Sequence, residues 1–339
     1  MADDITPTNR VVPQPPAGAR RRSPLRSFLR WREASIIVVA VVLVAYFYIS
    51  NADFLSVDNL QTLSQLVAPW VIIACGEIML LVCGEIDLSV GQVFALAPFV
   101  MYFANQAGLP LWLSIVVALG VAAVVGAFNG IVTVLLNVPS FVTTLGSLFI
   151  LNGLTLTISR GFPVNTPGGP AITAIMGGGG FSEFLWALAV VAVMHVVLRH
   201  TAWGMHTIAV GANAIGASEA GIDVGRIRIG NFVLTSIFGG LTGILEAFRI
   251  ASTDPLAGGT EYMFLAVAAG VIGGTSLAGG SGTILGGLIG AIVLAVLRDG
   301  FTLQGINAFT FDLIIGGAIV LAMVANVRVA KLRDTGGRS

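Results

Sequence analysis

Carboxylates stand inside or directly beside long apolar stretches in the first hundred residues. Glu77 lies within an apolar run, and the segment Gly84–Gly91 (GEIDLSVG) follows that run. An acidic side chain at the centre of a membrane helix costs at least about 2.5 kcal/mol on insertion scales, so such a residue is a candidate for proton, ion or substrate chemistry. Around Glu77, the neighbours Cys75, Gly76 and Met79 supply no partner, and the sequence gives it no defined role.

Two interpretations of Gly84–Gly91 stay open, and they are compatible. In the first, the segment is a solvated tight turn in which Asp87 caps the next helix, with help from Ser89. In the second, it is a broken or re-entrant segment, and Glu85, Asp87 and Ser89 line a transport pathway. Asn129 and Thr143 are further pathway candidates, since Pro139 separates two helices between them and Ser140 is an expected N-cap.

The run Gly270–Thr283 is rich in glycine, and its Thr275 and Ser276 are also pathway candidates. A phosphate-binding Walker A loop needs a lysine after its glycines, but the sole lysine of the chain is Lys331. The chain is therefore not an ATPase by that route. Gly282, Gly286 and Gly290 recur at every fourth position, which predicts a helix face packed closely on a neighbour. Gly84–Gly91 also aligns with Gly273–Gly280, a weak signal of internal duplication.

No other group of residues has the spacing of a metal or redox site. His195, His200 and His206 lack the HExxH order of a zinc site, and Cys75 and Cys83 share one apolar run. We therefore expect no metal and no cofactor in this chain.

Composition indicates that lipid surrounds most of the chain. Of the 339 residues, 56% are hydrophobic and only 10% are charged, whereas a soluble domain carries about 25% charged residues. Ten apolar runs are candidate membrane helices. They are Ala34–Ile49, Leu66–Val82, Leu88–Phe103, Leu111–Leu135, Phe141–Ile158, Phe184–Leu198, Ile229–Phe248, Tyr262–Leu277, Ile284–Leu297 and Phe309–Val324.

Basic residues gather before the first run, around the central loop Thr201–Arg228, and after Asn326. Because positive charge marks the cytoplasmic side, an even number of spans satisfies all three clusters at once. The sequence thus predicts an all-α polytopic membrane protein with both termini in the cytoplasm. Its parts would be a disordered basic arm (1–33), a transmembrane domain (34–326) and a tail (327–339).

Three arginines fall on the opposite side in this topology: Arg160, Arg249 and Arg298. They are either snorkelling side chains or fixed charges that receive acidic groups of a partner protein. Glu246 lies three residues before Arg249 and is expected to pair with it, which weakens a docking role for that arginine.

The central loop contains small residues that favour a short helix bounded by glycines. Its marked positions are Gly204, Gly211, Asn213, Glu219 and Gly221. A short helix on a cytoplasmic surface is typical of a docking element, although an ordinary surface loop is the alternative.

From about Asn59 to Arg333 the chain resembles the permeases of ribose-, xylose-, arabinose- and galactose-type ABC importers. The resemblance is carried by Gly84–Gly91, by Asn129 through Gly146, by Ile208 through Ile222 and by Ala268 through Thr283. Members often carry acidic residues just after the asparagine of the third segment, where this chain has Ala214 and Ile215.

The resemblance implies a bacterial inner-membrane subunit that moves a small sugar by alternating access and is not itself an enzyme. It implies a second permease copy, an extracytoplasmic sugar-binding protein, and ABC ATPase subunits that bind ATP and Mg²⁺ and press on the central loop. An ion-coupled secondary transporter, with Glu77 or Asp87 carrying a proton, is the main alternative, and a passive channel or scaffold is a second.

Overall fold

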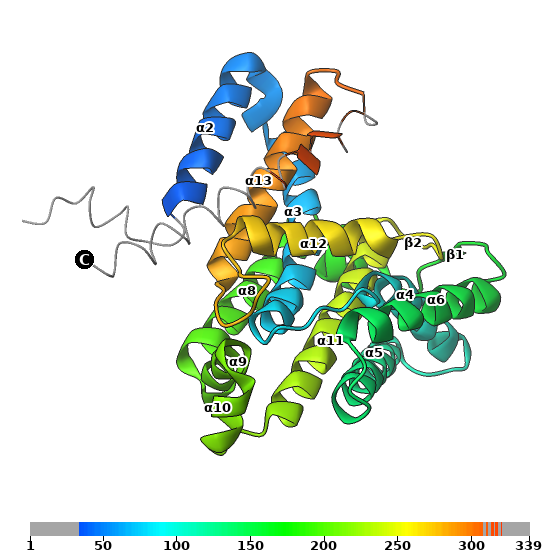
Figure 1. The fold of residues 1–339 in the computed structure, drawn as a ribbon. Helices are drawn as coiled ribbons and strands as arrows, with labels where there is room; N and C mark the ends of the chain where they lie inside the picture. Colours follow the sequence, from blue (N-terminus) through cyan, green and yellow to red (C-terminus); the bar gives the residue numbers. More distant parts are fainter. Residues whose placement is uncertain (1–33, 308–309, 311–312, 315, 318–319, 321–339) are drawn as a thin grey trace, which may run out of the picture.

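The computed structural model describes residues 34–307, 310, 313–314, 316–317 and 320. The predicted arm 1–33, the tail 327–339 and most of the tenth expected span, Phe309–Val324, lie outside the described residues. The described part is almost entirely helical, in agreement with the predicted fold class (Figure 1).

Helix α3 (Val57–Val82) forms the axis of the molecule. Ser56 caps its start by accepting from the Asn59 amide at 3.3 Å, and Asp58 adds a negative charge to its first turn. Every residue from Val67 to Val82 is buried, because other helices surround this half of α3. The helices packed on it are α8 (Ser182–His200), α11 (Val224–Arg249), α12 (Gly259–Ile272) and α13 (Ile284–Leu303).

The remaining helices cover this centre. They are α2 (Ala34–Ser50), α4 (Val90–Gln106), α5 (Leu111–Leu135) and α6 (Ser140–Ser159), with the short helices η1 (Ala52–Leu55), α7 (Pro170–Thr173), α9 (Ala202–Ala212) and α10 (Ala214–Glu219). In Figure 1, α9 and α10 lie at the lower end of the bundle, and α2 lies beside α13 at the upper end.

Six described helices are long and apolar enough to cross a membrane: α3, α5, α6, α8, α11 and α13. Helices α2 and α12 are apolar but shorter. The described residues therefore support a multi-pass membrane protein, and the predicted count of ten spans is not confirmed by them.

Two regions differ from the predicted helices. The expected span Tyr262–Leu277 is wrong at its end, because α12 stops at Ile272 and Gly274 takes a φ of +90°, which glycine adopts without strain. Between α6 and α8 the chain adds a two-residue strand, β1 (Val164–Asn165), and a π-helical turn, η2 (Ala174–Gly178). Strand β1 pairs antiparallel with β2 (Ser252–Thr253), a small departure from an all-helical chain.

The predicted close packing of Gly286 and Gly290 is confirmed. A Cβ atom at Gly286 would overlap the carbonyl of Gly273, which follows α12, and one at Gly290 would overlap the carbonyl of Ala269 in α12. Helices α12 and α13 therefore approach each other to backbone contact, as small residues allow in lipid. The prediction is wrong for Gly282, because it lies before the start of α13 and so is not on this helix face.

Candidate functional site

Asp87 and Ser89, in the segment between α3 and α4, form a buried polar cluster with Asn129 of α5 and Ser147 of α6. Asp87 Oδ1 accepts from the Ser89 amide at 2.8 Å and from the Ser89 hydroxyl at 2.6 Å. The Asn129 amide group of α5 donates to Ser89 Oγ at 2.9 Å and lies 3.4 Å from Asp87 Oδ2. Ser147 of α6 donates to Asn129 Oδ1 at 2.5 Å. The cluster thus fastens the broken segment to two neighbouring helices.

Two expected caps in this region are wrong. The expected cap of α4 by Asp87, with help from Ser89, is absent, because Asp87 Oδ1 accepts from the amide and hydroxyl of Ser89, which is itself the N-cap residue. Asp87 and Ser89 are both fully buried, so these two side chains are not solvated as the first interpretation expected. Pro139 occupies the N-cap of α6, so Ser140 is already the first helical residue. The Ser140 hydroxyl lies 3.4 Å from the Ile86 amide and joins α6 to the same segment.

The other carboxylates near this segment differ in how they are balanced. Glu85 forms an ion pair with Arg228 of α11, with 3.2 Å between Oε1 and Nε. Glu77 is completely buried in α3, and neither of its oxygens has a hydrogen-bond partner within the described part of the chain. Thr143 and Thr275 are likewise buried with hydroxyls that lack a partner among the described residues.

The central loop folds into the two short helices α9 and α10, so its predicted helical character is confirmed. Thr201 caps α9 by accepting from the Gly204 amide at 3.3 Å, and Asn213 caps α10 by accepting from the Gly216 amide at 3.0 Å. Glu219 ends α10 as an exposed residue, and Gly221 follows with a φ of +85°.

Gly211, in the last turn of α9, lies against two other segments. A Cβ atom there would overlap the Val82 carbonyl at the end of α3 and would lie 2.7 Å from the Gly280 amide. The Gly280 amide itself donates to the Val82 carbonyl at 2.8 Å. In the same loop, the Ser276 amide donates to the Ser281 carbonyl at 2.9 Å. Helix α9, the end of α3 and the glycine-rich loop 273–283 therefore meet through their backbones.

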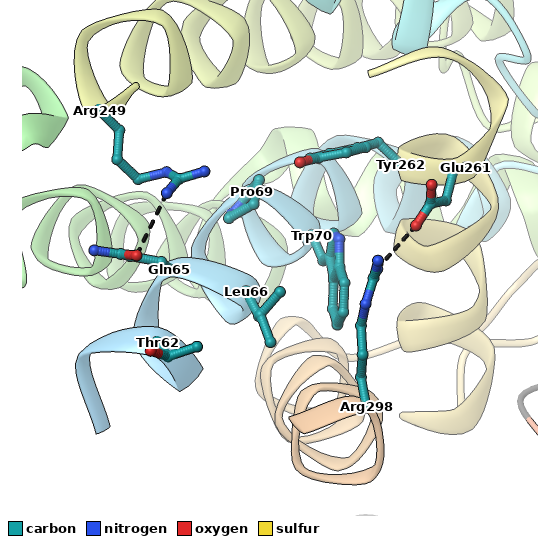
Figure 2. A pocket seen from close by; sticks show the side chains of 9 residues that line it. All are labelled: Thr62, Gln65, Leu66, Pro69, Trp70, Arg249, Glu261, Tyr262 and Arg298. Carbon is teal, nitrogen blue, oxygen red and sulfur yellow. Dashed lines mark hydrogen bonds and ion pairs between the residues drawn. The ribbon is translucent and has the colours of Figure 1, made fainter. Parts of the chain in front are cut away.

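A cavity of about 310 Å³ lies around the other half of α3 (Figure 2). Polar and aromatic side chains from four helices converge on it. Its walls are Thr62, Gln65, Leu66, Pro69 and Trp70 of α3, Arg249 of α11, Glu261 and Tyr262 of α12, and Arg298 of α13. The cavity thus borders the first half of α3, and the contact at Gly211 lies at the end of its buried second half.

Both arginines of the cavity are paired with carboxylates. Arg249 donates from Nε to Glu246 at 2.7 Å, as the spacing predicted, and also faces the buried Glu183 at 3.5 Å. Arg298 pairs with Glu261 at 2.8 Å, and its guanidinium lies 5.7 Å from the centre of a Trp70 ring.

The third predicted docking arginine, Arg160, is not among the residues that line the cavity. Arg160 follows α6 in a left-handed conformation, with a φ of +54°, and is exposed. Sequence reasoning singled out Arg249 and Arg298 but missed the cavity that they share. It also missed Glu183 and Glu261, although a carboxylate in the first turn of an apolar helix was a readable signal in both cases.

Comparison with known proteins shows which family this arrangement belongs to. Residues 59–323 match the family described as branched-chain amino acid transport system / permease component. The xylose/arabinose import permease protein XylH of Sulfolobus acidocaldarius is 37% identical over 305 residues, which cover 86% of this chain and 84% of that protein. The ribose import permease protein RbsC of Escherichia coli K12 is 32% identical, over 86% of this chain and 92% of its own length.

The galactose/methyl galactoside import permease protein MglC of Salmonella typhimurium is 33% identical over 88% of this chain and 95% of its own length. No solved structure matches the chain. The chain therefore belongs to this family of permease components, and within it resembles the sugar ABC importer permeases.

Proposed function

We propose that this chain is the membrane-spanning subunit of an ATP-driven importer for a small sugar. The observation that carries the proposal is the similarity to permeases for xylose/arabinose and ribose, which extends over 86% of the chain. The family match over residues 59–323 includes both the cavity and the α9–α10 region, the parts that a transport cycle would use.

In this proposal α9 and α10 receive the ATPase subunits. Gly211 lies in backbone contact with the end of α3 and with loop 273–283, so a displacement of α9 reaches two segments of the permease at once. Helix α3 then connects that contact to the cavity around its first half. Sugar and ATP act on the same equilibrium between two shapes, and each shifts it only by its differential affinity for them.

The partners follow from the same proposal. ABC ATPase subunits bind ATP and Mg²⁺, an extracytoplasmic binding protein delivers the sugar, and a second permease copy completes a dimer in a bacterial inner membrane. Arg160, Arg249 and Arg298 are the proposed docking residues for the binding protein. Arg160 does not line the cavity, so Arg160→Glu tests docking cleanly, and an unchanged association rate of the binding protein would contradict its role.

A secondary transporter is the alternative function, and one observation favours it. Glu77 is a fully buried carboxylate without a hydrogen-bond partner among the described residues, and an intramembrane carboxylate is a candidate proton carrier. Such a transporter would work without ATPase subunits and would follow an ion gradient.

Reconstitution into proteoliposomes separates the two functions. The chain is combined with its candidate ATPase and binding protein, and ATP hydrolysis and uptake of labelled xylose, ribose or galactose are measured. We expect the rate of ATP hydrolysis and the uptake of labelled sugar to increase with sugar concentration, and both to require this chain. Uptake that persists without ATPase and collapses with the proton gradient, and that Glu77→Gln abolishes, would establish the alternative instead.

A further inference from the structure

The cavity beside α3 concentrates polar side chains within apolar helices. Gln65, Arg249, Glu261, Tyr262 and Arg298 reach it from four different helices (Figure 2). The charged side chains are only partly buried, since Arg249 is 26%, Arg298 35% and Glu261 59% exposed, so the cavity is open to solvent. A concave site on which several polar groups converge is the usual location of a small-molecule ligand. The cavity is therefore a candidate ligand site.

The charges of the cavity are already compensated by the protein. Arg249 is paired with Glu246 and faces Glu183, and Arg298 is paired with Glu261. An anionic ligand would have to compete with these carboxylates for the guanidinium groups. The site thus offers many hydrogen-bond donors and acceptors but no uncompensated positive charge, which favours a neutral ligand with several hydroxyl groups.

The remaining walls agree with such a ligand. Gln65 accepts from Arg249 through Oε1 at 3.4 Å, which leaves its amide nitrogen as a donor, and Tyr262 contributes a hydroxyl that can donate or accept. Leu66, Pro69 and Trp70 form an apolar side. A sugar ring has hydroxyls at its edge and C–H groups on its faces, so it can use both kinds of wall.

The size of the cavity limits the ligand. Its volume of about 310 Å³ lies at the lower end of the range of about 300–1,000 Å³ for small-molecule sites. A single sugar ring fits this space better than a chain of rings does.

We propose that this cavity is a transient binding site for one neutral monosaccharide within the permease itself. The proposal rests on the proposed function and adds a place inside this chain where the sugar is held after delivery. Gln65 and Tyr262 bind hydroxyls, while the two arginine–carboxylate pairs line the site. The competing occupant is a branched-chain amino acid such as leucine, whose carboxylate would need one of the paired arginines.

Cysteine protection tests the site in the full chain in lipid nanodiscs. Thr62 is exposed at the cavity, so Thr62→Cys should react with a membrane-impermeant methanethiosulfonate reagent. The native Cys75 and Cys83 are buried and free, and the unsubstituted chain measures their background. Asn165→Cys is the matched control, because Asn165 is exposed and lines a different cavity.

We expect xylose, ribose or galactose to slow modification of the Thr62→Cys chain at least about threefold and to leave Asn165→Cys unchanged. Adding Gln65→Leu should raise the half-protecting sugar concentration about three- to tenfold, the effect of one lost neutral hydrogen bond. Gln61 lies one turn earlier on α3, outside the cavity, so Gln61→Leu should leave the half-protecting sugar concentration unchanged.

The other outcomes overturn the assignment in distinct ways. Equal slowing at both cysteines means a non-specific effect of the solute, and protection by leucine but not by sugars means a different ligand class. No protection, in a chain whose full complex still imports sugar, removes this site and leaves the proposed function standing. In the opposite case, sugar protects the cysteine, but the full complex neither imports sugar nor hydrolyses ATP in response to it. That result supports the binding site and contradicts the proposed function.

Discussion

At the scale of single residues, the buried polar groups near the end of α3 fall into two kinds. Asp87 is surrounded by donors from Ser89 and Asn129, so the loss of water around its carboxylate is offset by hydrogen bonds. Glu77 is as deeply buried but has no hydrogen-bond partner among the described residues. The first arrangement stabilises one conformation, whereas the second leaves an unbalanced group in the core of the molecule.

Asn129→Leu should destabilise the protein markedly. The substitution keeps the volume roughly constant but removes the only side chain that joins Asp87 and Ser89 to Ser147 in this cluster. A buried group that loses its partner costs about 1–3 kcal/mol, and a charged one costs more. Thermal unfolding of the purified chain should show a clear drop in Tm. Asn165→Leu is the exposed control and should change Tm little; equal shifts for both variants would contradict the role given to Asn129.

Sequence reasoning at this scale succeeded for local pairs and failed for distant ones. Glu246 and Arg249 lie one helical turn apart, so their spacing alone predicted their contact. Glu183 reaches the same arginine from another helix, and Ser147 reaches Asn129 likewise. No periodicity in the chain encodes such contacts, because they depend on how helices pack.

At the scale of elements, the ends of α3 and α12 have the same backbone design. Gly84 and Gly274 both take positive φ values, and each donates its amide three residues back along the chain. The following residue, Glu85 or Thr275, donates five residues back, which is a common way to end a helix. The structural equivalent of Gly84 is therefore Gly274, one position beyond the alignment that the sequence suggested.

Gly211→Ala should weaken the coupling between ATPase and transport. The added methyl group would overlap the Val82 carbonyl and push α9 away from the end of α3. In the reconstituted complex we expect sugar-stimulated ATP hydrolysis to fall at least about tenfold, while the cysteine-protection signal at the cavity stays. Gly120→Ala on α5 is the control, since nothing lies within 4 Å of its added Cβ. An unchanged ATPase response in Gly211→Ala would show that this contact does not transmit the motion.

At the scale of the whole molecule, hydropathy predicted the peripheral helices best. The expected run Leu111–Leu135 coincides with α5, whose most apolar stretch is only 22% buried within the described part of the chain. The most apolar stretch of α3 is 89% buried. The helix begins at Val57, well before the expected Leu66, and hydropathy missed its first turns because they are more polar. The expected run thus matches the apolar, buried half of α3 to its last residue and misses the polar first turns, because hydropathy detects apolar side chains whether lipid or protein surrounds them.

Topology reporters test the predicted arrangement of the chain. Alkaline phosphatase, which is active only outside the cytoplasm, is fused after Gly161, after Gly221 and at the C-terminus. We expect activity at Gly161 alone, because ten spans leave the central loop and both termini in the cytoplasm. Activity at the C-terminus would mean an odd number of spans. A fluorescent protein at each site gives the complementary signal and controls for expression.

The burial of α3 also bears on how the protein is made. This helix leaves the ribosome early, carries Pro69 and Glu77, and finds its neighbours α8, α11, α12 and α13 only after at least a hundred further residues have been synthesised. Until then its carboxylate would face lipid or the insertion machinery, at a cost of several kcal/mol. Biogenesis must therefore shelter α3 while the later helices arrive, and a chain cut off before α13 would expose the helix that the finished protein hides most completely.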